Sequence, residues 1–138
     1  MDLYEQIVRD EGGNQLKPYV DAAGKTRIGV GRNLTDDGIS ASEGFLMFQN
    51  DVSNCKISVS TRLPWTDTLD DARYAVFINM CFNMGIGRLM GFEKMLAAAH
   101  VGNWAEAHDD LLDCEHVSLL GIDRAKRLAK QLLTGGWV

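Results

Sequence analysis

The stretch RDEGGNQLKPYVDAAGKTRIGVGRN, residues 9–33, contains a helix end, a hairpin and two acids. Two glycines follow Glu11 and end the preceding helix, because glycine adopts left-handed dihedrals without steric cost. The runs LKPYV and RIGVG flank the turn-forming DAAGK and predict a β-hairpin. Glu11 is therefore expected at a helix exit, and Asp21 beside the turn of a small β lobe.

The residues on either side of this stretch predict helices. Asp2 and Glu5 form a capping box for a first amphipathic helix, and SASE at Ser40–Glu43 forms a second capping box. The helix after Ser40 is expected to end near Asn54. Apolar periodicity predicts further helices, at Thr66–Met84, about Phe92–Ala99, about Asn103–Leu112 and about Asp123–Leu133.

The order of these elements predicts an α+β fold in a single domain of 138 residues. Its expected parts are an N-terminal helix (1–11), a β lobe (12–39) and a helical lobe (40–138), with a cleft between the two lobes. The first helix is expected to pack on the helical lobe. Gly29 and Gly31 have no side chain to pack, which indicates a close approach by another backbone or by a ligand.

Composition excludes several classes of protein. The formal net charge of −5 disfavours a nucleic-acid partner, and no apolar run approaches the ~20 residues that cross a bilayer. The three cysteines are far apart in the chain, which predicts reduced thiols rather than a disulfide framework. The histidines lack an HExxH arrangement, so they predict no metal site, and nothing in the chain calls for a cofactor.

Two acids in different surroundings are what glycoside hydrolysis requires. One acid protonates the leaving oxygen, and one carboxylate activates water or attacks the sugar. Apolar neighbours at a helix exit would favour protonated Glu11, whereas Asp21 beside a solvated turn should stay ionised. Many pairs among 19 acids would satisfy this pattern, so the pair by itself is weak support.

Four blocks of the chain give that pair a context: DEG followed by LKPYVDAAGK and IGVGRNL, then ISASEGFLMFQNDV, FINMCFNMGIGRLMGF and DRAKRLAKQLLTGGW. Through these blocks the whole chain resembles the phage-type lysozymes, glycoside hydrolase family 24. The resemblance implies a lysozyme fold and a muramidase that cleaves the β-1,4 bond between N-acetylmuramic acid and N-acetylglucosamine. Its expected role is phage-induced lysis of the host cell, as an endolysin.

The resemblance also implies roles for individual residues. Glu11 corresponds to the general acid and Asp21 to the carboxylate that activates water or stabilises positive charge. Arg124 corresponds to an arginine that pairs with the catalytic glutamate. The expected substrate-binding residues that line the cleft are Leu34, Phe82 and Asn83, with Arg124 beside them.

Two positions depart from the family's pattern. Arg27 stands where the family usually has a threonine, and Thr26 comes one residue earlier, which in a strand points to the opposite face. Three accounts stay open: a bulge returns Thr26 to the site, Arg27 takes its place in a modified mechanism, or catalysis is impaired. Arg32 stands in place of a histidine and is expected to pair with Asp51.

Several expectations about the setting follow from the resemblance. The partner would be peptidoglycan glycan strands, with no nucleic acid and no membrane insertion. A monomer would wait in the host cytoplasm until a holin released it to the periplasmic wall. A lytic domain excised from a tail protein, a lytic transglycosylase and a catalytically impaired wall-binding domain are the alternatives.

Overall fold

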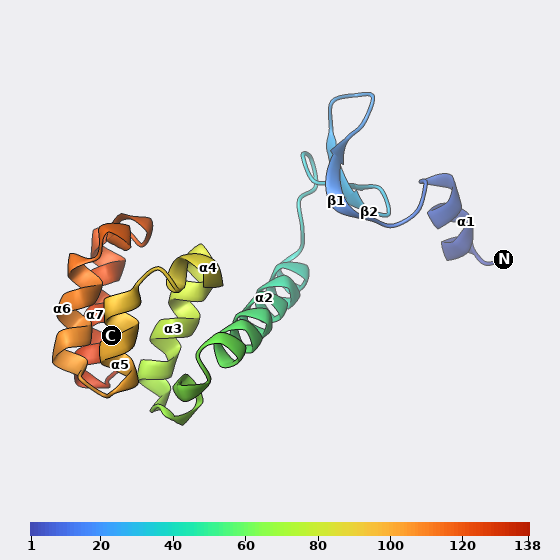
Figure 1. Ribbon diagram of the computed structural model, residues 1–138. Helices are drawn as coiled ribbons and strands as arrows, with labels where there is room; N and C mark the ends of the chain where they lie inside the picture. The colour runs from blue at the N-terminus through green and yellow to red at the C-terminus, as the bar shows by residue number, and fades with distance from the viewer. The chain divides into compact units, whose positions relative to one another are not determined.

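The structure is a computed structural model that describes all 138 residues. It confirms the α+β class, with seven α-helices, two 3₁₀ helices and one three-stranded antiparallel sheet. The chain divides into two compact units, Met1–Met47 (unit 1) and Phe48–Val138 (unit 2), which Figure 1 colours from blue to green and from green to red. The single domain and its cleft stay predictions.

Unit 1 begins with α1, Leu3–Asp10, which forms as its caps predict. The Asp2 carboxylate accepts a hydrogen bond from the Glu5 backbone at 2.8 Å, and Glu5 accepts one from the Asp2 backbone at 2.9 Å. Gly12 and Gly13 end the helix with φ of +81° and +96°. Every residue of α1 is exposed, although its sequence is strongly amphipathic.

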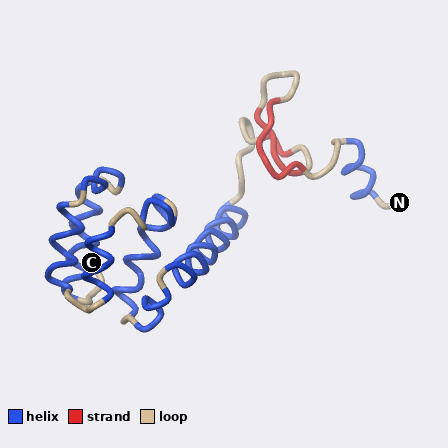
Figure 2. Tube along the Cα trace, in the orientation of Figure 1, coloured by secondary structure: helices blue, strands red, loops and turns tan.

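The sheet has the order β1–β2–β3, formed by Gln15–Val20, Thr26–Gly29 and Arg32–Asn33 (Figure 2). The predicted hairpin is confirmed, with Tyr19 opposite Arg27 and Val20 opposite Thr26. Strand β3 was not predicted, because two residues are too few to show an alternating pattern.

Helix α2, Ala41–Arg62, is longer than predicted. The capping box forms, since Glu43 Oε1 accepts from the Ser40 backbone at 3.0 Å and Ser40 Oγ accepts from the Glu43 backbone at 3.1 Å. The expected end near Asn54 is wrong. No glycine or proline lies between Asn54 and Pro64, and Val59, which is fully buried, gives the added turns a core contact.

The predicted helix Thr66–Met84 begins later than expected. Residues Pro64–Thr68 form the 3₁₀ helix η1, and α3 runs from Asp71 to Met84. Asp70 is the N-cap of α3, because its carboxylate accepts from the Arg73 backbone at 3.1 Å. As predicted, α3 is the central buried helix, and Val76, Phe77 and Met80 are fully buried.

The remaining helices of unit 2 complete its core: α4 (Ile86–Leu89), α5 (Glu93–His100), α6 (Trp104–Asp113), η2 (Glu115–Leu119) and α7 (Ile122–Thr134). The three helices predicted here are confirmed as α5, α6 and α7. Helix α6 packs against both α5 and α7, as the orange and red ribbons of Figure 1 show. None of the helices combines the length and apolar character that a membrane span requires.

Arg73, near the start of α3, ties that helix to the end of α7. Its Nε donates to the Leu132 carbonyl at 2.7 Å and its Nη2 to the Leu133 carbonyl at 3.0 Å. The guanidinium also lies 4.4 Å from the centroid of the Trp104 ring. These bonds satisfy carbonyls of the last turn of α7, which have no partner within the helix.

Candidate functional site

Asp21 opens the turn between β1 and β2 and is held there by several donors. Its Oδ1 accepts hydrogen bonds from the backbone of Ala23 and Lys25, both at 2.9 Å, and its Oδ2 accepts one from Arg27 Nε at 2.6 Å. The bond from Arg27, followed by the bond from Lys25, lowers the pKa of Asp21 below its usual value. Asp21 is therefore a carboxylate at neutral pH.

Arg27 joins this carboxylate to the loop that follows β2. Its Nη1 donates to the Gly31 carbonyl at 2.7 Å, while its Nε is bonded to Asp21. The hydrogen bond that Arg27 donates to Asp21 is the main cause of the raised pKa of Arg27, and the charge of Glu11 adds to it. The guanidinium thus binds Asp21 directly and is also attracted by the charge of Glu11.

Glu11 reaches the same loop from the end of α1. A Cβ atom built on Gly31 would lie 2.6 Å from Glu11 Oε2, closer than such atoms approach in real proteins. Gly31 also has φ of +68°, a conformation that favours glycine. The close approach expected at this glycine from a backbone or a ligand is made instead by the Glu11 side chain. Glu11 is exposed, and the apolar surroundings expected for it stay a prediction.

The strand register decides which side chain meets Asp21. Thr26 lies opposite Val20 and Arg27 lies opposite Tyr19, and the irregularity in β1 falls earlier, between Gln15 and Tyr19. Neighbouring residues of a strand point to opposite faces, so Arg27 and Thr26 cannot both face Asp21. Arg27 occupies the position beside Asp21, so no bulge returns Thr26 to the site. The other two accounts, a modified mechanism and impaired catalysis, stay predictions.

Arg32 binds a different acid from the one expected. It was predicted to pair with Asp51, but its guanidinium contacts Glu43, at 3.0 Å from Nη1 and 2.9 Å from Nη2. Glu43 is available because the capping box holds it at the start of α2. The bond from Arg32 and those from Ser40 lower the pKa of Glu43 to about 2.

Arg124 donates hydrogen bonds to Asn79 and Asn83 and lines the same cavity as Phe82. Its Nε donates to Asn79 Oδ1 at 2.9 Å and its Nη1 to Asn83 Oδ1 at 2.6 Å. Arg124, Asn79, Phe82 and Trp137 line one cavity of about 610 Å³ with several apolar side chains. Unit 2 therefore carries an aromatic pocket with a cation on its wall. The expected pairing of Arg124 with Glu11 stays a prediction.

Leu34, the remaining predicted residue, follows β3 in unit 1. It is half-buried, and its backbone N–H donates to the Thr26 carbonyl at 2.8 Å. Its contact with substrate stays a prediction.

The predictions made from the sequence do not include one residue of these clusters, Asn79, or the contact of Gly31 with Glu11. Asn79 precedes Asn83 by one helical turn, so the i, i+4 rule places both amides on one face of α3 and could have identified it. For Gly31 the sequence indicates close approach by a backbone or a ligand, not by a side chain. Its contact with Glu11 joins positions 20 residues apart, and no local pattern signals that contact.

Comparison with known proteins identifies relatives of the whole fold. The family model for phage lysozyme matches residues 9–129. The pre-baseplate central spike protein Gp5 of Enterobacteria phage T4 is 26% identical over 166 residues, an alignment that covers 98% of this chain and 28% of the spike protein. The chain thus corresponds to about a quarter of that protein's length.

Relatives of more similar length come from a eukaryote. Probable T4-type lysozyme 1 of Dictyostelium discoideum is 24% identical, over 78% of this chain and 80% of that protein. Probable T4-type lysozyme 2 of the same organism is 28% identical, over 79% and 81%. Together with the family match over most of its length, these likenesses establish that the chain belongs to the phage lysozyme family, whose members are lysozyme-type glycoside hydrolases.

Proposed function

We propose that this chain hydrolyses the β-1,4 bond between N-acetylmuramic acid and N-acetylglucosamine in peptidoglycan. Glu11 donates a proton to the leaving oxygen, and Asp21 activates water or stabilises the positive charge that develops on the sugar. The observation that carries this proposal is the convergence of both acids on the Arg27–Gly31 segment, Asp21 through Arg27 and Glu11 against Gly31.

The hydrogen bonds of Asp21 suit a carboxylate that stays ionised and still binds water. A carboxylate offers about four acceptor positions, of which three are taken by Ala23, Lys25 and Arg27. One position is left for a water molecule. In this proposal Arg27 aims the carboxylate, the role that we assign to it in place of the family's threonine, and Thr26 supports it through the strand.

Arg27 also sets a requirement on Glu11. The guanidinium attracts the ionised form of Glu11, whereas a general acid has to be protonated. Bound glycan would exclude water from the exposed Glu11 side chain, and such desolvation favours the protonated form. We propose that Glu11 becomes able to donate a proton when glycan binds and excludes water from its side chain.

The aromatic pocket of unit 2 supports a role in holding the sugars. Phe82 is 43% exposed and its ring meets that of Phe48 edge to face at 5.7 Å, so an apolar surface is open to a sugar ring. Asn83 Nδ2 donates to the Leu119 carbonyl at 3.1 Å and keeps its second N–H, and Arg124 keeps the N–H groups of Nη2, so both retain donors for acetamido and carboxylate groups. With Leu34 in unit 1, these residues make up the proposed substrate-binding set.

We further propose a role in phage-induced lysis of the host cell. A monomer would accumulate in the host cytoplasm and reach the periplasmic wall through a holin. The family match supports this role. The likeness to the phage T4 spike protein favours a second setting, a lytic domain within a tail protein, because the alignment covers nearly all of this chain.

The experiment compares wild type, Glu11→Gln and Asp21→Asn on outer-membrane-permeabilised Gram-negative cells. Wild type should clear the suspension. Both variants should clear it about 10³-fold more slowly or worse, as expected when a catalytic group is removed. Mass spectrometry of the fragments then identifies the reaction. Reducing ends that contain oxygen from heavy-oxygen water would support hydrolysis. Fragments with 1,6-anhydro ends would show that the reaction is transglycosylation instead.

A catalytically impaired wall-binding domain is the second candidate, and the 2.6 Å bond between Arg27 and Asp21 is the observation that favours it. If Arg27 blocks Asp21, wild type and both variants should bind peptidoglycan and clear cells equally poorly. In that case Arg27→Thr should restore clearing. If Arg27 aims Asp21, the same substitution should lower activity.

A further inference from the structure

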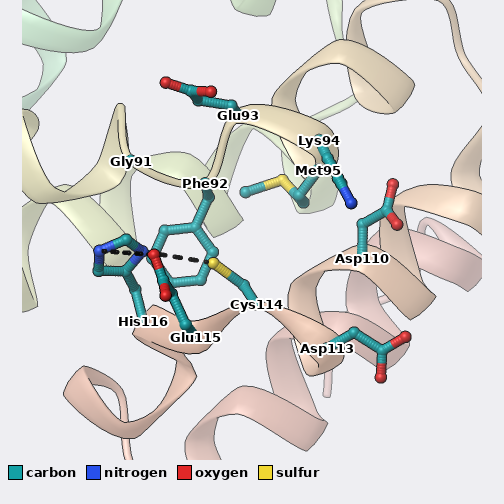
Figure 3. A pocket seen from close by; sticks show the side chains of 10 residues that line it. All are labelled: Gly91, Phe92, Glu93, Lys94, Met95, Asp110, Asp113, Cys114, Glu115 and His116. Atoms are coloured by element: carbon teal, nitrogen blue, oxygen red, sulfur yellow. Dashed lines mark hydrogen bonds and ion pairs between the residues drawn. The ribbon is translucent and has the colours of Figure 1, made fainter.

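A second cavity of unit 2, about 370 Å³ in volume, contains a cysteine beside a histidine (Figure 3). It lies among α5, α6 and η2, and Phe92 and Met95, both buried, form its apolar floor. None of its lining residues belongs to the predicted catalytic or substrate-binding set. The function of this cavity is therefore a question separate from glycan cleavage.

Cys114 and His116 are in direct contact at one side of this cavity. The Cys114 Sγ lies 3.6 Å from His116 Nδ1, a hydrogen bond that Figure 3 marks with a dashed line. The imidazole also contacts Phe92, with ring centroids 6.0 Å apart, and its Nε2 lies 4.0 Å from Glu115 Oε1. An imidazole nitrogen beside a thiol can take the thiol's proton.

The other two cysteines lack this combination. Cys81 is 5% exposed, and burial raises the pKa of its thiol to about 11. Cys55 is half-buried and its thiol meets Cys81 rather than a base. No cluster of three His, Cys, Asp or Glu side chains is placed to hold a metal ion, so the Cys114–His116 pair lacks the third ligand of a metal site. Cys114 alone combines access to a cavity with a neighbouring base.

Carboxylates dominate the charge around this thiol. The cavity is lined by one lysine, Lys94, and by four acids, which are Glu93, Asp110, Asp113 and Glu115. Figure 3 shows them around the rim on α5, α6 and η2. Such a rim repels anions and concentrates cations, which changes association rates about tenfold or more.

We propose that Cys114 is a covalent modification site for soft electrophiles that carry no negative charge, with His116 as the base. With an α-halo amide, Sγ forms a bond to the carbon that bears the halogen, and the halide leaves with the bonding electron pair. The thiol proton passes to His116 Nδ1. This inference is independent of the proposed function.

The test uses iodoacetamide and iodoacetate, which differ in charge but not in leaving group. The reduced, folded chain is treated for short times, and each cysteine is quantified by peptide mass spectrometry. Iodoacetamide should modify Cys114 about 10²-fold faster than Cys55, because a general base contributes about 10² or more. Cys81 should stay unmodified because its side chain is buried. Equal rates at Cys114 and Cys55 would overturn the proposal.

Two variants test separately the role of His116 as the base and the effect of the surrounding carboxylates on the charge preference. His116→Gln keeps a polar side chain without a basic nitrogen and should slow modification of Cys114 about 10²-fold, with Cys55 as the internal control. Asp110→Asn combined with Asp113→Asn should raise the ratio of the iodoacetate rate to the iodoacetamide rate at Cys114. These acids make no hydrogen bond that the fold depends on, and circular dichroism checks the folding of both variants. An unchanged rate in His116→Gln, or an unchanged ratio in the double variant, would refute the corresponding role.

Discussion

The contact between Gly31 and Glu11 predicts that an added methyl group at position 31 impairs activity more than stability. In Gly31→Ala the Cβ would lie 2.6 Å from Glu11 Oε2, whereas ordinary contact begins at 3.4 Å, so the carboxylate has to retreat by the difference of 0.8 Å. That movement is cheap for the end of a flexible side chain. The proton donor is displaced, however, and a shift of about 1 Å can cost about 10²-fold in rate.

Gly29→Ala is the matched control. Gly29 has φ of +69°, against +68° at Gly31, but its added Cβ would have no neighbour nearer than 3.8 Å. Both variants should lose about 1–2 kcal/mol of unfolding free energy, because alanine is strained in the left-handed region. For a chain of this size that is a fall of about 3–8 °C in Tm.

The assay is the initial rate of release from dye-labelled peptidoglycan, with thermal denaturation of the same preparations. Gly31→Ala should be about 10- to 100-fold slower than Gly29→Ala at equal Tm. In a Glu11→Gln background the same substitution should have no further effect on rate, because the group it displaces is already inactive. Equal rates for the two alanine variants would refute the reasoning.

Three further predictions concern charge and the core. Arg27→Gln removes the main cause of the low pKa of Asp21, so the acid limb of kcat/KM against pH should move to higher pH, and an unmoved limb would contradict the role of this bond. Glu43 has its pKa lowered from 4.5 to about 2, so the stability due to its carboxylate is complete above pH 4.5 and is lost as pH falls through about 2. Glu43→Gln should flatten Tm against pH over that window, and a parallel curve would count against the Arg32 pairing. Phe77→Ala should cost about 3–5 kcal/mol in urea denaturation, because Phe77 is fully buried, and a loss below about 1 kcal/mol would show that its site collapses.

Local signals explain the parts of the fold that the sequence predicts well. The cap at Asp2, the capping box at Ser40 and the turn that begins at Asp21 depend on residues a few positions apart, and all three form as expected. The end of α2 depends on a distant contact. Its last turns continue because Val59 is buried in the core of unit 2, and the residues around Asn54 do not show this.

The same division applies to the candidate site. The hairpin places Asp21 and Arg27 near one another, and this much follows from their spacing. The choice of Arg27 over Thr26 depends on which strand positions pair, and one residue of slip would reverse it. Neither the Glu11 contact with Gly31 nor the Glu43 partner of Arg32 could be predicted, because each joins parts of the chain that meet only after folding.

The bonds from Arg73 to the last carbonyls of α7 have a consequence for hydrogen exchange. Helix ends ordinarily fray, and their amides exchange with solvent through local openings of small free energy. Here the final turn of α7 is held by a residue 59 positions earlier in the chain, so releasing it breaks a contact of α3 as well. Amides near Thr134 should therefore exchange together with those of α3, as one cooperative unit that includes both helices.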